Sequence, residues 1–113
     1  MLKVMIATEG DIIGLRVKGH AGYAREGEDI VCASASILAY TVAQFVREAE
    51  KRGDLASPAQ IRLEKGDTMV VCEPKKKWRD AMRGAYIFAN KGYELLAHNY
   101  PQNVELITDV EAI

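Results

Sequence analysis

The chain has 113 residues, enough for one domain and too few for two of ordinary size. Its 15 Lys and Arg residues nearly balance its 16 Asp and Glu residues, so the net charge of −1 indicates neither a nucleic acid nor an anionic membrane as partner. No apolar stretch approaches the roughly 20 residues of a membrane span, and the start turns acidic before a signal-peptide core forms.

These totals predict a single domain over residues 1–113 in the cytoplasm. In that reducing compartment Cys32 and Cys72 are expected to be free thiols rather than a disulfide. The two cysteines also lack the CxxC spacing of zinc sites and dithiol redox motifs.

Two short segments rich in β-branched residues, 2–8 and 12–19, predict a β-hairpin at the start of the chain. The turn-like residues 9–11 separate them. In the second segment apolar and charged residues alternate, which places Leu15 and Val17 together on the covered face.

Helical spacing from about Ala33 to Arg52 predicts the first helix, with Gly53 ending it. Its expected inward side consists of two adjacent rows: Ile37, Thr41, Phe45 and Ala49 in one, and Leu38, Val42 and Val46 in the other.

A second hairpin is predicted over residues 59–73, with its turn at 65–67, and Pro74 ends it. A long helix then runs to about His98, and residues 103–108 form a last short strand. The inward row of this helix is expected to contain Trp78, Met82, Ala85, Ala89, Tyr93 and Leu96.

The predicted order is ββαββαβ. Because the strands alternate in polarity, only one face of the sheet should be covered. We therefore expect an α+β fold, a mostly antiparallel sheet with two helices packed on one face.

The segment "GHAGYAREGEDIVCASAS" places a histidine at the end of a strand and a cysteine at the start of a helix. Unpaired N–H groups and the helix dipole favour an anion such as a thiolate at Cys32. His20 can take the thiol proton and return it to a leaving group. The N–H groups around Cys32 and Ala33 can hold an oxyanion.

Two neighbours of this pair have more than one interpretation. Asp29 can orient the His20 ring as the third member of a triad, or it can cap the helix. Ser36 is expected to be a small helical residue packing under Cys32 rather than a nucleophile.

Other interpretations of the same residues stay open. Cys32 can be a small buried apolar residue, and His20 can be structural. A metal site from His20, Glu28, Asp29 and Cys32 is conceivable, although zinc sites favour tighter paired spacings. A phosphatase-type cysteine loop is excluded because "CASASIL" has no arginine after the cysteine.

The segment resembles the signature of the ribosomal-processing cysteine proteases, the Prp family. The matching residues are Gly19 and His20, then Asp29 to Ala33, and Ser36. The interval of twelve residues between histidine and cysteine also fits, and the rest of the chain matches more loosely through its length and element order.

The resemblance implies a cysteine endopeptidase whose His20–Cys32 dyad removes a short N-terminal extension from a bacterial large-subunit ribosomal protein. It implies cleavage after aromatic or apolar residues, and a homodimer. The sequence has no phosphate-binding glycine motif, so neither a cofactor nor a metal is expected. Gly19 resembles a position where a side chain would crowd the site, and Asp29 and Ser36 match positions that support the dyad.

The loop from Ala21 to Glu28 is expected to be mobile and to close over substrate. Gly22 and Gly27 lower the cost of moving its backbone, and its residues look too polar to anchor in a core.

The remaining reactive or charged residues receive other roles. Cys72 is expected to be a packed strand residue, and His98 interacts with the end of its helix. The cluster Lys75-Lys76-Lys77 is either a solvated or loop segment or a patch that attracts a ribosomal surface. The alternative for the whole chain is a non-catalytic module that binds the ribosome or its assembly factors.

Overall fold

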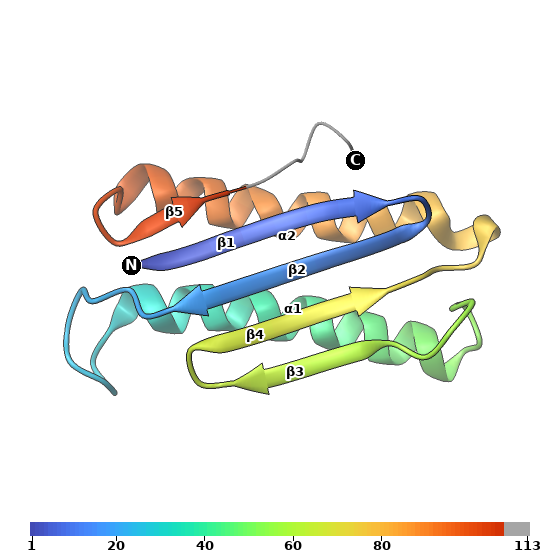
Figure 1. Ribbon diagram of the computed structural model, residues 1–113, viewed down its shortest axis with the longest axis horizontal. Helices are drawn as coiled ribbons and strands as arrows, with labels where there is room; N and C mark the ends of the chain where they lie inside the picture. Colours follow the sequence, from blue (N-terminus) through green and yellow to red (C-terminus); the bar gives the residue numbers. More distant parts are fainter. Residues whose placement is uncertain (108–113) are drawn as a thin grey trace.

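The computed structural model describes residues 1–107, and these residues form one sheet covered by two helices (Figure 1). The elements in chain order are β1 (Leu2–Glu9), β2 (Ile12–Gly19), α1 (Ile30–Lys51), β3 (Gln60–Glu64), β4 (Asp67–Cys72), the 3₁₀ turn η1 (Lys76–Trp78), α2 (Arg79–Asn99) and β5 (Val104–Leu106). Thr108, the last residue of the predicted final strand, lies outside the described residues.

The five strands are arranged in the order β3-β4-β2-β1-β5. Every neighbouring pair is antiparallel except β1 and β5, which are parallel. Both helices lie on the same side of the sheet (Figure 1). The predicted α+β fold, with two helices on one face of a mostly antiparallel sheet, is therefore confirmed, as are both hairpins.

Helix α1 begins three residues earlier than its sequence periodicity predicts, at Ile30 rather than Ala33. The reason is Asp29, whose side chain caps the helix and fixes its first turn. At the other end Gly53 has φ +79°, and the Gly53 and Asp54 N–H groups donate to the carbonyls of Glu50 and Ala49. This is the predicted glycine termination, in the form of a Schellman motif.

The predicted inward side of α1 is partly wrong. Ile37 and Phe45 are 61% and 41% exposed, and Thr41 is exposed too. The buried stripe consists of small and β-branched residues: Val31, Ala35, Ala39, Val42, Ala43, Val46 and Ala49. Small side chains let the helix pack closely against the sheet, and the larger apolar residues are left on its outer surface.

The predicted second helix begins later than expected, because the turn η1 precedes it. The lysine cluster lies in and just before this turn, directly ahead of the helix N-terminus at Arg79. Trp78 is 39% exposed and Ala85 is only half-buried, which corrects their expected inward positions. The buried residues of α2 are Met82, Tyr86, Ala89, Asn90, Tyr93 and Leu96.

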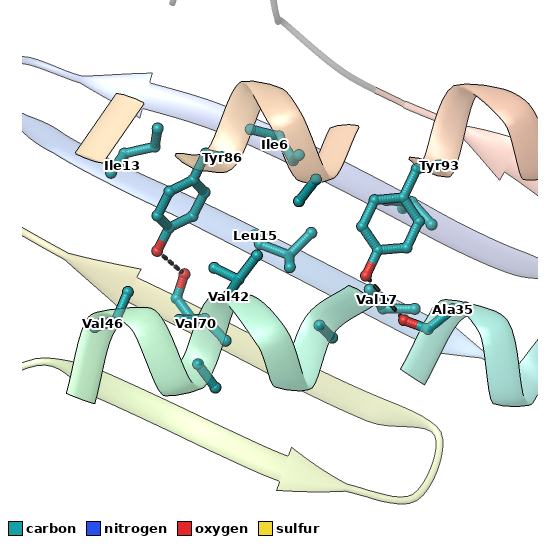
Figure 2. Close-up of a cluster of buried hydrophobic side chains, with 14 of the residues drawn as sticks. Ile6, Ile13, Leu15, Val17, Ala35, Val42, Val46, Val70, Tyr86 and Tyr93 are labelled. Atoms are coloured by element: carbon teal, nitrogen blue, oxygen red, sulfur yellow. Dashed lines mark hydrogen bonds between the residues drawn. The ribbon is translucent and has the colours of Figure 1, made fainter. Parts of the chain in front are cut away.

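Two buried tyrosines of α2 bond it to the sheet and to α1 (Figure 2). The hydroxyl of Tyr86 donates to the carbonyl of Val70 in β4 at 2.9 Å. The hydroxyl of Tyr93 donates to the carbonyl of Ala35 in α1 at 3.0 Å. The second bond ties α2 to the first turns of α1, which carry Cys32.

The sequence-based statement that no apolar stretch approaches a membrane span needs correction. By length and composition α1 is apolar enough to cross a membrane. One side of it is buried in the core of this domain, however, and a core helix passes the same test.

Candidate active site

A cavity of about 560 Å³ lies at the end of the sheet where β2 finishes. Three segments surround it: the loop after β2, the first turns of α1, and the β3–β4 turn, all at one end of the molecule (Figure 1). His20 and Cys32 both line this cavity. The structure therefore brings together the two residues that the sequence singles out.

Cys32 lies in the first turn of α1 and is partly exposed. The main-chain N–H of Ala21 donates to its sulfur at 3.3 Å. This contact holds the loop after β2 against the first turn of α1.

The expected oxyanion donors are not free. The Cys32 N–H donates to the Asp29 carboxylate at 3.0 Å, and the Ala33 N–H donates to the Asp29 carbonyl at 3.0 Å. The sequence prediction that these two groups wait unpaired at the helix N-terminus is therefore wrong, because the cap residue satisfies both.

His20 follows the last residue of β2, and its side chain is exposed. Its imidazole lies against Gly66 in the β3–β4 turn, where an added Cβ would be 3.0 Å from Nε2. The end of β2 and the β3–β4 turn together therefore place the His20 ring at the cavity.

Asp29 is the helix cap, which decides between the two interpretations of this residue. One carboxylate oxygen accepts from the N–H groups of Val31 and Cys32, and the other accepts from those of Tyr23 and Ala24. Desolvation by burial alone would raise the pKa of this carboxyl, but the four backbone donors hold the pKa below its usual value. Within residues 1–107 no hydrogen bond joins Asp29 to His20.

The other predicted supporting residues also border the cavity. Ser36 lies one turn beyond Cys32 on the same side of α1, and Ala33 lies beside it with its side chain exposed. Gly19 has φ +95°, and a Cβ there would be 2.5 Å from the carbonyl oxygen of Met1. Gly19 is thus required by its backbone and by the neighbouring strand, more than by crowding of the cavity itself.

The loop after β2 is better anchored than its polar composition suggests. Ala21 is 2% exposed and belongs to the core, and its carbonyl accepts from the Asn103 side chain at 2.9 Å. The Tyr23 ring packs edge-on against Tyr100. Gly22 and Gly27 both have positive φ and line the cavity. The expectation that nothing in this segment anchors in a core is therefore wrong for Ala21.

The surroundings of Cys72 make its thiol unreactive. It is 2% exposed in β4, and its sulfur lies 3.8 Å from the Tyr86 hydroxyl. Desolvation by burial raises the pKa of this thiol to about 11, against a smaller opposing effect of the Tyr86 hydrogen bond.

The described part of the chain, residues 1–107, gathers no group of three or more His, Cys, Asp or Glu side chains that could hold a metal ion. The conceivable set of His20, Glu28, Asp29 and Cys32 is thus not assembled as a ligand sphere. His98 is exposed in the last turn of α2.

Three residues that border the site were missed at the level of sequence. Ala21 acts through its main chain, and Gly66 acts by lacking a side chain, so neither carries a local signal. Tyr40 lines the cavity two turns beyond Cys32. Its spacing of eight residues from Cys32, through Ser36, is a helical signal that does indicate a shared face.

The family model described as Cysteine protease Prp matches residues 1–105 of this chain. The chain belongs to this family. It is accordingly a cysteine protease, and the alternative of a non-catalytic module is set aside. A search of curated protein sequences finds no match.

Solved structures agree with this assignment at the level of the fold. The essential ribosomal processing protease Prp from S. aureus, in complex with a covalently linked product peptide, is 18% identical with a TM-score of 0.73, covering 96% of this chain and 100% of that one. The same protease in complex with a substrate peptide is 17% identical with a TM-score of 0.66, and the match covers 96% of this chain and 100% of that one. SMU.848 from Streptococcus mutans is 23% identical with a TM-score of 0.66, and the match covers 96% of this chain and 93% of that one.

The contrast between the two cysteines predicts selective alkylation. Iodoacetamide should modify Cys32 in the folded protein and leave Cys72 unmodified, because burial keeps the Cys72 thiol protonated and inaccessible. Mass spectrometry of tryptic peptides measures this directly, and urea-unfolded protein, labelled at both positions, is the control. Faster labelling of Cys72 would contradict the assignment.

Replacing Asp29 should separate its two functions. Asp29→Asn keeps one oxygen for the helix cap but loses the acceptor for Tyr23 and Ala24, whereas Asp29→Ala loses both. We expect the Ala variant to lose about 1–2 kcal/mol of unfolding free energy, and the Asn variant to lose less while the loop amides exchange faster.

The same carboxylate makes this effect depend on pH. Because the folded pKa is lowered, its stabilisation is present at neutral pH and is lost as the pH falls from about 4 through the folded value. Urea unfolding at pH 7 and at pH 3 should therefore show a smaller difference between wild type and Asp29→Asn at the lower pH. An equal difference in unfolding free energy at the two pH values would contradict this role of the Asp29 carboxylate.

Proposed function

We propose that this cysteine protease removes a short N-terminal extension from a bacterial large-subunit ribosomal protein, with Cys32 as nucleophile and His20 as general base and acid. The observation that carries the proposal is the single cavity lined by both side chains, with a main-chain donor on the Cys32 sulfur. Support for the substrate comes from the fold shared with the S. aureus ribosomal processing protease. The place of action is then the cytoplasm.

The chemistry follows from these groups. His20 takes the thiol proton, and the Cys32 sulfur attacks the carbonyl carbon of the peptide bond, forming a C–S bond. As the C–N bond breaks, His20 returns the proton to the leaving amine. Water, deprotonated by His20, then attacks the thioester, releasing the acid and the thiol. No cofactor takes part in these steps.

The cavity suits an extended peptide with an apolar side chain. Leu2, Val17 and Ala35 contribute apolar surface beside the Cys32 turn, and Tyr40 adds an aromatic wall. An aliphatic or aromatic side chain before the cut would bury apolar area here, whereas a charged one would have to be desolvated.

Substitution of the dyad tests the proposal. With a peptide from the unprocessed ribosomal protein, Cys32→Ser should abolish cleavage, and His20→Ala should slow it by a factor of about 10² to 10⁴. Cys72→Ser, the matched control, should cleave normally and melt at a lower temperature, because it places a hydroxyl in the core. Mass spectrometry reads the cut site. An active Cys32→Ser with an inactive Cys72→Ser would refute the site.

Substrate binding should order the tip of the loop after β2. Ala21 is fixed in the core, and the N–H groups of Ala24 and Glu28 are hydrogen-bonded. Residues 25–27 between them are exposed; Gly27 is the last of these, and Gly22 lies before them. We expect fast hydrogen exchange at residues 25–27 in the free enzyme and slower exchange with a non-cleaved peptide on Cys32→Ser. Protection in the free enzyme equal to that of α1 would rule out such gating.

The exposed apolar surface of the helices supports a homodimer. Ile37 and Phe45 of α1, and Phe88 and Leu95 of α2, are between 41% and 75% exposed. Sedimentation velocity should find a dimer that Phe88→Lys converts to a monomer. Ile12→Lys, on the uncovered face of the sheet, is the control and should remain dimeric. A monomeric wild type at every concentration would contradict this part of the proposal.

A further inference from the structure

The turn between β3 and β4 is in direct contact with the proposed general base. Gly66 in this turn has φ +75°, and a Cβ added to it would lie 3.0 Å from Nε2 and 3.2 Å from Cε1 of His20. A side chain at this position would press against this edge of the imidazole.

The turn is held in place relative to His20. The N–H of Gly19, the residue before His20, donates to the Gly66 carbonyl at 2.9 Å. On either side of the turn Glu64 and Asp67 are paired with each other, and Asp67 is also paired with Lys18 of β2. Because the backbone is fixed by these contacts, the exposed imidazole is the group that would move if Gly66 acquired a side chain.

We propose that Gly66 is a positioning residue, whose lack of a side chain sets where the His20 imidazole lies relative to Cys32. The inference rests on the proposed function, in which His20 moves the proton. Proton transfer needs hydrogen-bond geometry, and a displacement of an ångström can cost a hundredfold in rate. A Cβ at 3.0 Å requires the ring to give way by a few tenths of an ångström, so a loss of about tenfold is expected.

The chain contains a matched control for the backbone effect. Gly53 has φ +79°, close to the value at Gly66, but a Cβ there meets no atom within 4 Å. Gly53→Ala therefore imposes the same left-handed strain as Gly66→Ala without touching the site. Gly66→Asn is the complementary variant, since asparagine tolerates positive φ but still carries a Cβ.

The experiment compares wild type, Gly66→Ala, Gly66→Asn and Gly53→Ala by peptide cleavage, urea unfolding and the NMR signal of the His20 ring. We expect Gly66→Ala and Gly53→Ala to lower the urea midpoint alike. Only the two Gly66 variants should shift the His20 signal and reduce kcat about tenfold with KM nearly unchanged.

Two results would overturn the inference: a kcat of Gly66→Ala equal to that of Gly53→Ala, or full recovery of kcat in Gly66→Asn, which would point to backbone strain alone. Cys32→Ser and His20→Ala are assayed in parallel. If either cleaves at the wild-type rate, the proposed function itself fails. If both are impaired and the Gly66 variants are not, only the positioning role fails.

Discussion

One carboxylate, that of Asp29, organises the cavity. It accepts hydrogen bonds from two N–H groups of the first turn of α1 and from two of the loop after β2. The same side chain therefore decides where the helix begins and how the loop turns back toward Cys32. Its negative charge lies near a proposed thiolate, an arrangement that would be unfavourable if the charge were not already balanced by four donors. With these helix N–H groups occupied, the donor to the Cys32 sulfur is the main-chain N–H of Ala21.

The sequence predicts the architecture well because its local signals agree with one another. Alternation in residues 12–19 and the glycine turns act over a few residues, and the fold follows from them. The inward face of α1 was harder to predict, because large apolar residues are normally expected inside. Here alanine and valine form the whole buried stripe, and which side of the helix meets the sheet is decided only in the assembled fold.

The residues of the candidate site also fall into two groups, those that the sequence predicts and those that it does not. His20, Cys32 and Asp29 are visible in the sequence because their side chains have recognisable chemistry at a suitable spacing. Gly66 reaches the site only through the pairing of β2 with β4, which joins residues about fifty positions apart along the chain. Ala21 contributes a main-chain N–H, which any residue but proline would provide. Neither contribution has a sequence signal until the sheet register is known.

The glycines with positive φ have a consequence for the evolution of this enzyme. Four of them, Gly19, Gly22, Gly27 and Gly66, line the cavity, whereas Gly10 and Gly53 lie elsewhere. Most single substitutions at the four would strain the backbone, so this part of the wall tolerates little variation. Tyr40 on α1 has ordinary helical geometry and can change without that strain. Divergence in cleavage preference should therefore accumulate along one face of a helix, while the opposite wall stays constant among descendants.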